Sequence, residues 1–216
     1  MRREIGLDME METETVVTEP ETTEKDNKKK KEKKKRSPVS YVVEGLIYVM
    51  LIVFCVYIVP NYMLQRTVVS GESMEDTLKN GESLLVDKLS YHFSDPERYD
   101  IIVFYPKGKD VDEYYVKRIY GLPGETIQIK ANDILINGEK IDDPYAKDGM
   151  DEAGIAAKPY TLKEGEYFVL GDHRSVSLDS RVTPDEDPDA PGPVKFENIA
   201  GKVFLRIWPL SEFGVP

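Results

Sequence analysis

The sequence predicts a mainly β domain with an antiparallel sheet, preceded by one N-terminal transmembrane helix. Three observations lead to this expectation. A single membrane-length apolar stretch lies near the N-terminus, frequent short β-rich runs follow it, and turn-forming Gly, Pro and Asn residues separate those runs. No long amphipathic helical pattern follows the apolar stretch. With 216 residues, the chain has room for one domain of ordinary size besides the anchor.

Residues 1–40 are expected to form a cytoplasmic tail whose charge falls into two blocks. Residues 1–27 hold nine acidic and three basic residues, with few apolar residues and no helical or strand period, so we expect disorder there. Residues 28–36 hold eight basic residues and one acidic residue. A nucleic-acid-binding tail and a localisation signal are alternatives. The position next to an apolar stretch favours a juxtamembrane segment that stays in the cytoplasm and attracts anionic lipid.

Residues 41–64 are interpreted as a transmembrane anchor. The charge-free core, residues 46–59, gives roughly 20 residues with its flanks, enough to cross a hydrocarbon layer of ~30 Å as a helix. The alternative is a cleavable secretory signal, but the run is long for the apolar part of such a signal and no clean Ala-x-Ala site follows it. An uncleaved anchor in the cell membrane, with a cytoplasmic N-terminus, would place residues 65–216 on the extracytoplasmic side.

Residues 65–216 are expected to form the antiparallel β domain, because short β-rich runs are bounded there by Gly or Pro. The predicted strands are residues 83–87, 100–105, 114–120, 126–129, 133–136, 167–170 and 201–207. Asn137-Gly138 is the strongest short-range signal for a hairpin. Two stretches, about residues 142–164 and the Pro- and Asp-rich residues 184–193, are expected to be surface excursions.

Charge and residue content narrow the function classes. The net charge is -11, which leaves -12 on residues 37–216, and an acidic body argues against a nucleic-acid partner. The single cysteine, Cys55, lies within the apolar stretch, so we expect no intrachain disulfide, no Cys-based zinc site and no Cys nucleophile. The only histidines are His92 and His173, so a His-dependent triad would have to use one of them. No H-E-x-x-H spacing occurs, so a metal site would have to rely on carboxylates, and we expect neither a metal nor a cofactor.

The remaining chemistry is a serine with a lysine as its base. A serine hydroxyl is a poor nucleophile until a base takes its proton. A lysine can serve only if burial lowers its pKa from ~10.4. Strand alternation puts Lys117 on one face with Tyr115 and Ile119, and Arg118 on the other. Alternation alone favours a surface lysine whose stem lies along apolar neighbours, just as Ser73 alone fits a solvated turn serine.

Three ordered segments change this interpretation, because together they resemble the bacterial type I signal peptidases (signal peptidase I). The segments are Ser73-Met74, Tyr115-Val116-Lys117-Arg118, and Gly171-Asp172-His173-Arg174 followed by Ser177 and Asp179-Ser180-Arg181. The resemblance is to the single-anchor, Gram-positive-type members of these S26 serine peptidases and covers roughly residues 38–210. It implies that Ser73 is the nucleophile and Lys117 its general base.

The same resemblance implies supporting and substrate-binding roles. Ser177 would hydrogen-bond to the lysine amine and orient it, while Asp179 and Arg181 would form an ion pair that holds the wall of the site. A purely structural salt bridge is the alternative for that pair. Gly71 stands where other members of the family supply a hydroxyl to the oxyanion, so backbone groups or water would donate instead. The residues expected to contact substrate are Val69, Ser70, Gly71, Glu72 and Met74.

Three departures from the family pattern bear on rate and pH optimum. Asp76 stands where the family usually has proline, His173 stands where asparagine is common, and the acidic residues 185–189 lengthen the loop after Arg181. Asp76 would alter the turn after Ser73, and His173 would make activity more sensitive to pH.

The resemblance implies a membrane-anchored serine endopeptidase that removes signal peptides from secreted precursors after small residues at -1 and -3. Its partners would then be secretory precursors and membrane lipid, with no nucleic acid. One alternative is a Ser–Lys protease of the same fold that cleaves itself or a regulator. Another is a non-catalytic anchored β domain that binds envelope partners. The presence of both Ser73 and Lys117 counts against that binding module, which needs neither residue.

Overall fold

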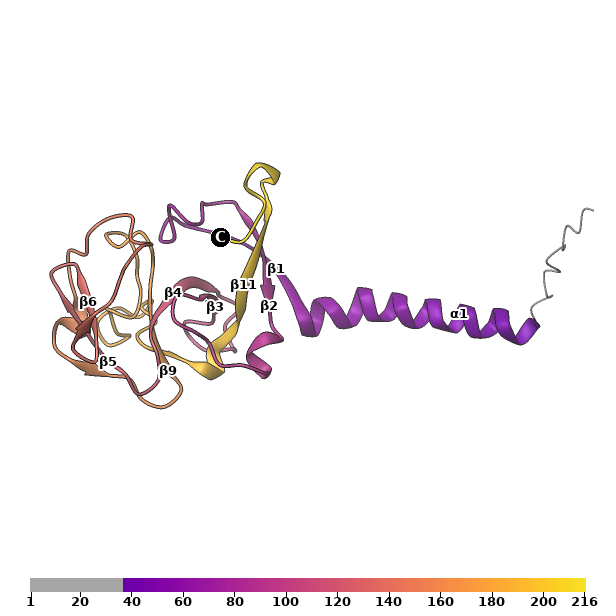
Figure 1. Cartoon of the computed structure of the whole chain (residues 1–216), viewed down its shortest axis with the longest axis horizontal. Helices are drawn as coiled ribbons and strands as arrows, with labels where there is room; N and C mark the ends of the chain where they lie inside the picture. Colours follow the sequence, from indigo (N-terminus) through magenta and orange to yellow (C-terminus); the bar gives the residue numbers. More distant parts are fainter. Residues whose placement is uncertain (1–36) are drawn as a thin grey trace, which may run out of the picture. The chain divides into compact units, whose positions relative to one another are not determined.

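A computed structural model describes residues 37–216 of the chain, so the expectations for residues 1–36 lie outside the described residues (Figure 1). The helix α1 (Pro38–Val53) continues as a π-helix, η1 (Phe54–Met63). Within the described part of the chain, one helical stretch, Pro38–Val59, is long and apolar enough to cross a membrane, with a mean hydropathy of 2.6. None of the residues of α1 is buried. Leu64, which the sequence analysis placed at the end of the anchor, is the first residue of a strand.

Seven strands form the larger sheet, in the order β1-β2-β11-β3-β4-β9-β10, and every neighbouring pair is antiparallel. Their bounds are β1 (Leu64–Val68), β2 (Ser83–Asp87), β3 (Ile101–Phe104), β4 (Tyr115–Gly121), β9 (Glu166–Leu170), β10 (Val194–Lys195) and β11 (Ile199–Trp208). Four antiparallel pairings separate β1 from β4, so these two strands run in the same direction.

Four strands form the smaller sheet, in the order β7-β6-β5-β8. They are β5 (Thr126–Lys130), β6 (Asp133–Ile136), β7 (Glu139–Lys140) and β8 (Tyr160–Thr161). The predicted hairpin is confirmed: Asn137 and Gly138 join β6 to β7 with φ angles of 53° and 87°. Both values lie in the left-handed region that this kind of two-residue turn requires.

The predicted mainly β, antiparallel architecture is confirmed, and the bounds of the seven predicted strands differ from the observed ones by at most two residues. The remaining short helices of the described chain are 3-10 turns: η2 (Ser90–His92), η3 (Gly154–Ala157), η4 (Phe196–Asn198) and η5 (Leu210–Glu212). The expected surface excursion at 142–164 is wrong in part. Ala156 and Leu162 are buried, because η3 and the strand β8 cover the core beside β5.

In residues 37–216 the apolar core comprises three clusters, and one of them lies under the turn that follows β1. Val69, Met74 and Leu78 are buried there. They pack against β2 and β3 through Leu84 and Val103. The turn between β1 and β2 is therefore fixed to the sheet at both of its ends, and the polar residues between these anchors are left near the surface.

Candidate active site

Ser73 lies in the turn between β1 and β2, directly before the buried Met74. The turn is held by a hydrogen bond of 2.7 Å from the N–H of Leu78 to the carbonyl of Met74. Met74 is 2% exposed and Leu78 is fully buried, whereas Ser73 is half-buried. The apolar anchors thus present the Ser73 hydroxyl at the border between core and solvent.

Lys117 lies on β4, opposite Ile102 of β3, and is only 4% exposed. Its Nζ is 2.6 Å from Ser73 Oγ, which brings together the two residues that the sequence analysis named as nucleophile and base. Burial lowers the pKa of Lys117 to about 8, because desolvation disfavours the ammonium. The negative charges of Asp179 and Asp172 raise this pKa, and the positive charge of Arg181 lowers it.

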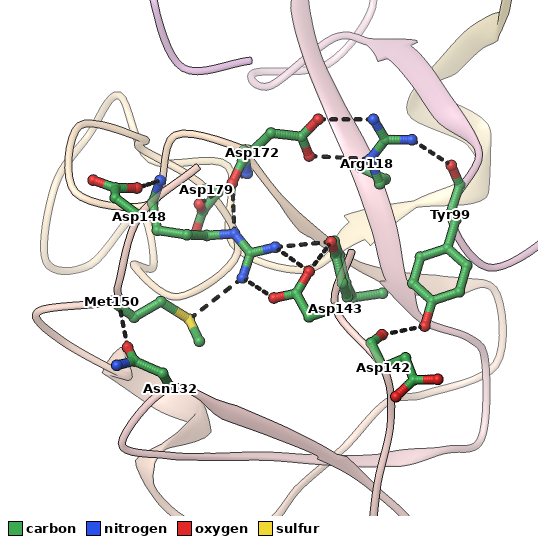
Figure 2. Close-up of polar contacts among 12 residues, drawn as sticks. Tyr99, Arg118, Asn132, Asp142, Asp143, Asp148, Met150, Asp172 and Asp179 are labelled. Carbon is green, nitrogen blue, oxygen red and sulfur yellow. Dashed lines mark hydrogen bonds and ion pairs between the residues drawn. The ribbon is translucent and has the colours of Figure 1, made fainter. Parts of the chain in front are cut away.

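Arg118 points to the other face of β4, as strand alternation predicts. Its Nε and Nη2 donate to the two carboxylate oxygens of Asp172, at 3.0 and 2.7 Å, and Nη1 donates to the carbonyl of Tyr99 (Figure 2). The guanidinium lies 3.7 Å from the ring centroid of Tyr145. Asp172 also accepts a hydrogen bond of 2.6 Å from Thr77 Oγ1, which ties this pair to the turn after Ser73.

The segment 171–173 lies directly against the Ser73 peptide. The N–H of His173 donates to the carbonyl of Ser73 at 3.1 Å, and His173 Nδ1 is 3.2 Å from the carbonyl oxygen of Glu72. A Cβ atom at Gly171 would overlap both the carbonyl of Ser73 and the hydroxyl of Ser177. Glycine is therefore required at 171 by close approach rather than by a special φ angle.

The expected hydrogen bond from Ser177 to the amine of Lys117 is absent. Ser177 Oγ is a buried oxygen without a hydrogen-bond partner in the described part of the chain. It lies against Gly171, while the amine of Lys117 is directed at Ser73 Oγ. The predicted hydrogen bond between Ser177 and Lys117 is therefore wrong, although Ser177 does lie beside the segment that contacts Ser73.

Asp179 and Arg181 form a buried ion pair with two hydrogen bonds, of 2.8 and 3.0 Å. Asp179 also accepts a hydrogen bond from the N–H of Gly171, and Arg181 donates to the carbonyl of Arg174 at 2.7 Å. Neither side chain hydrogen-bonds to Ser73 or Lys117. The geometry is that of a structural support for the segment that lies against Ser73.

A third buried ion pair was missed by the sequence analysis. Arg174, which is 1% exposed, donates to the two carboxylate oxygens of Asp143 at 2.7 and 2.9 Å and to the carbonyl of Gly171 at 2.8 Å. Tyr120 completes the contact by donating to Asp143 at 2.6 Å. Arg174 belongs to a motif that the sequence analysis used, but Asp143 lies in the stretch of about residues 142–164 that was expected to be a surface excursion.

The three departures from the family pattern lie at different places around the site. The side chain of Asp76 is 80% exposed and lies 3.6 Å from Lys147. His173 contacts the nucleophile turn and lies 3.7 Å from Asp148. In the acidic loop, Asp189 pairs with Lys107 at 2.6 Å, and its carbonyl accepts a hydrogen bond from Tyr115. The loop is thus fixed beside β4.

A groove of about 740 Å³ leads to the Ser73–Lys117 contact. Two segments, residues 67–74 and 113–117, line it together with Val176 and Leu178. The residues that the sequence analysis expected to contact substrate all line this groove: Val69, Ser70, Gly71, Glu72 and Met74. Among the described residues, no group of His, Cys, Asp or Glu side chains is suited to hold a metal ion.

Comparison with known proteins gives a consistent result. Residues 40–208 match the protein family described as signal peptidase, peptidase S26. The signal peptidase I of Bacillus caldolyticus is 39% identical over 163 residues, which cover 70% of this chain and 84% of that protein. The signal peptidase I of Leptolyngbya laminosa is 33% identical over 181 residues, which cover 81% and 84%.

Two further relatives were found among other bacteria. The signal peptidase IB of Staphylococcus aureus (strain COL) is 32% identical over 187 residues, which cover 80% of this chain and 92% of that protein. The crystal structure of a signal peptidase I from Enterococcus faecalis is 30% identical, with a TM-score of 0.38, and the match covers 51% of this chain and 97% of that one.

Proposed function

The chain belongs to the signal peptidase family, peptidase S26, and is a serine endopeptidase; from this premise we propose that it removes signal peptides with a Ser73–Lys117 dyad. The observation that carries the proposal is the distance of 2.6 Å between Ser73 Oγ and the Nζ of a lysine that is only 4% exposed. A buried lysine with a pKa of about 8 has a substantial neutral fraction in mildly basic solution, and only the neutral amine can accept a proton.

In the proposed mechanism, Ser73 Oγ attacks the scissile carbonyl carbon while its proton moves to Nζ of Lys117. The tetrahedral intermediate collapses when the Lys117 ammonium gives that proton to the leaving amine and the C–N bond breaks. The signal peptide is then held as an ester on Ser73. Water attacks this ester, Lys117 again takes the proton, and the serine hydroxyl is regenerated.

The developing oxyanion requires donors that are already in place. In the described part of the chain, the N–H of Ser73 donates to no acceptor, so it is available to the oxyanion. Gly71 has no hydroxyl to offer, and its N–H is engaged with the side-chain oxygen of Asn80 at 3.2 Å. The proposal therefore assigns oxyanion stabilisation to the Ser73 N–H and water.

The groove suits an extended peptide, because the segments 67–74 and 113–117 supply backbone on both sides of it. In an extended chain, alternate side chains face the same way, so the residues at -1 and -3 point to the same wall. That wall includes Val69, Met74 and Val116, which belong to one packed apolar cluster. Because these side chains are closely packed, they leave only shallow depressions for the substrate side chains, which supports a preference for small residues at -1 and -3.

The proposed location follows from the apolar helix and the adjacent basic block. The helix would anchor the protein in the cell membrane, with residues 28–36 on the cytoplasmic side and the β domain outside. Ser73 lies nine residues after Leu64, so even an extended chain at ~3.3 Å per residue keeps it within about 30 Å of the anchor. A cleavage site emerges at this depth while the apolar part of a signal peptide is still in the membrane.

The substitution Ser73→Ala tests the nucleophile. We expect cleavage of a precursor with Ala at -1 and -3 to fall below detection, because no hydroxyl remains to form the ester. The thermal unfolding midpoint should stay within the error of the wild type, since only a half-buried hydroxyl is removed. The matched control is Ser211→Ala, an exposed serine in η5, which should cleave normally. Cleavage by Ser73→Ala would remove Ser73 from the mechanism.

A further inference from the structure

A second hollow, of about 410 Å³, shares no lining residue with the active-site groove. We propose that it binds the phosphodiester headgroup of an anionic phospholipid at the end of the apolar helix. The residues that carry this inference are Tyr62, Lys88, His92, Tyr105, Lys109 and Glu197, and we call the hollow the headgroup pocket. The inference rests on the proposed transmembrane anchor and is independent of the catalytic chemistry.

The position of the headgroup pocket is fixed by the hydrogen bonds of the chain. The N–H of Lys88 donates to the carbonyl of Met63, the last residue of η1, at 2.9 Å. The next residue, Leu64, pairs with Asp87 in the sheet. Lys88 is thereby held beside the end of the helix, where Tyr62 also lines the pocket. Tyrosine and lysine at the end of a membrane-spanning segment occupy the depth of the lipid headgroups.

The charge of the headgroup pocket contrasts with that of the domain. Residues 37–216 carry a net charge of -12. The pocket nevertheless contains two lysines, Lys88 and Lys109, against a single carboxylate, Glu197. The Glu197 side chain is 73% exposed and lies 3.9 Å from the amine of Lys195 outside the lining. The pocket is therefore a local cationic site on an acidic domain, and a phosphate is the anion that a membrane surface offers in quantity.

Two tyrosines give the headgroup pocket fixed walls. Tyr91 donates its hydroxyl to Asp100 at 2.9 Å, and the Tyr105 hydroxyl lies 3.1 Å from that of Tyr114. Both rings are therefore held in place from outside the pocket. Because these side chains are already ordered in the free protein, ligand binding costs less conformational entropy.

An apolar hollow of about 240 Å³ is built from the same parts of the chain. Its lining is apolar at Met63, Leu64, Leu89, Phe93 and Phe204, and polar at Asp87 and Ser90. Both hollows use the end of η1 and the residues that follow β2, and Phe93 is 83% exposed directly after η2. A cationic hollow and an apolar hollow that share these elements match a phospholipid, in which a phosphate is joined to acyl chains.

The test measures lipid retention by the full-length protein. The protein is reconstituted in nanodiscs of phosphatidylcholine and phosphatidylglycerol, released, and examined by native mass spectrometry for bound phosphatidylglycerol. We expect the double variant Lys88→Gln/Lys109→Gln to bind this lipid roughly 30-fold more weakly, since two lysines near the lipid phosphate are removed. The control is Lys130→Gln/Lys158→Gln, two exposed lysines that line neither hollow, which should retain the lipid as the wild type does.

Three outcomes would overturn the proposal. The first is equal retention by the wild type and the Lys88/Lys109 double variant, with both folded by thermal unfolding. The second is an equal loss in the Lys130/Lys158 control, which would indicate a general charge effect. The third is complete displacement of phosphatidylglycerol by inorganic phosphate, because the site would then serve free phosphate rather than lipid. All three readouts are independent of precursor cleavage.

Discussion

Lys117 is surrounded by carboxylates that are already engaged with other cations. Asp172 is bound by Arg118 and Asp179 by Arg181, each through two hydrogen bonds. Both carboxylates raise the pKa of Lys117, but desolvation is the larger effect and lowers it. The positive charge of Arg181 adds to the lowering of this pKa, so the amine stays available as a base.

The pH dependence of kcat/KM follows from this lowered pKa. We expect kcat/KM for a precursor with Ala at -1 and -3 to rise with pH through an apparent pKa of about 8, because only neutral Lys117 accepts the Ser73 proton. Two pH units below that value, about one hundredth of the lysine is neutral, so the rate should fall about 100-fold. Contrary to the expectation from the sequence, the variant His173→Asn should keep the same rise of kcat/KM with pH, because His173 contacts Glu72 and Asp148 and makes no hydrogen bond to Lys117. If kcat/KM instead rises through the pKa of a free lysine, Lys117 does not act as a base with a lowered pKa.

Burial of Lys117 also has a measurable effect on stability. Its pKa is 10.5 in the unfolded chain and about 8 in the folded one, so between these values the unfolded state binds more protons and stability rises with pH. Below about pH 8 the folded protein bears the whole cost of the buried ammonium, about 3 kcal/mol.

The substitution Lys117→Met removes that cost without opening a large cavity. We expect the free energy of unfolding to increase by up to about 3 kcal/mol at pH 7, with the gain disappearing above pH 10.5. Urea unfolding at several pH values measures it. The exposed Lys130→Met should change stability little at any pH. A destabilised Lys117→Met variant would mean that the pairing of Lys117 outweighs its desolvation.

At the scale of elements, three arginine–carboxylate pairs with buried arginines fix the segment 171–181, two by linking it to other parts of the domain and one within the segment. They are Arg118–Asp172, Arg174–Asp143 and Arg181–Asp179, and each is formed by two hydrogen bonds. The Arg118–Asp172 pair connects this segment to β4, and the Arg174–Asp143 pair connects it to the loop that contains Asp143, whereas the Arg181–Asp179 pair lies within the segment. The polar framework therefore determines where Gly171 and His173 meet the Ser73 peptide.

Removing one partner of such a pair leaves a buried charge without compensation. We expect Asp172→Ala to lower the free energy of unfolding by roughly 3–5 kcal/mol, because the guanidinium of Arg118 is 3% exposed. In the exposed pair of Asp133 and Lys140, which are 51% and 63% exposed, Asp133→Ala should cost at most about 1 kcal/mol. Denaturant unfolding of both variants gives the comparison. Similar costs would show that burial does not set the energy of the Asp172 pair.

The partners in these ion pairs could be predicted only in part from the sequence. Alternation along β4 correctly separated Lys117 from Arg118, and turn residues located the hairpin at Asn137-Gly138. Asp143 could not be identified as the partner of Arg174, because the two are 31 residues apart and no local pattern links them. The two-residue strands β8 and β10 are too short to show a period, and β1 begins directly where the apolar helix ends.

At the scale of the whole molecule, charge and hydropathy predict which parts of the chain lie in the cytoplasm, in the membrane and on its outer side. Residues 28–36 are strongly basic, Pro38–Val59 is apolar, and residues 37–216 carry -12. Basic residues are retained on the cytoplasmic side of a spanning helix. The β domain, with its groove and headgroup pocket, should therefore lie on the outer side.

Cysteine labelling in intact cells tests this orientation, because Cys55 is the only cysteine and Cys55→Ala gives a cysteine-free background. In that background, Lys130→Cys places a thiol on an exposed position of β5, and Lys33→Cys places one in the basic block. We expect a membrane-impermeant maleimide to label only Lys130→Cys, since the bilayer excludes the reagent from the cytoplasm. Permeabilised cells should label both variants, which shows that each thiol is reactive. Labelling of Lys33→Cys alone in intact cells would reverse the orientation and put the groove on the wrong side of the membrane for exported precursors.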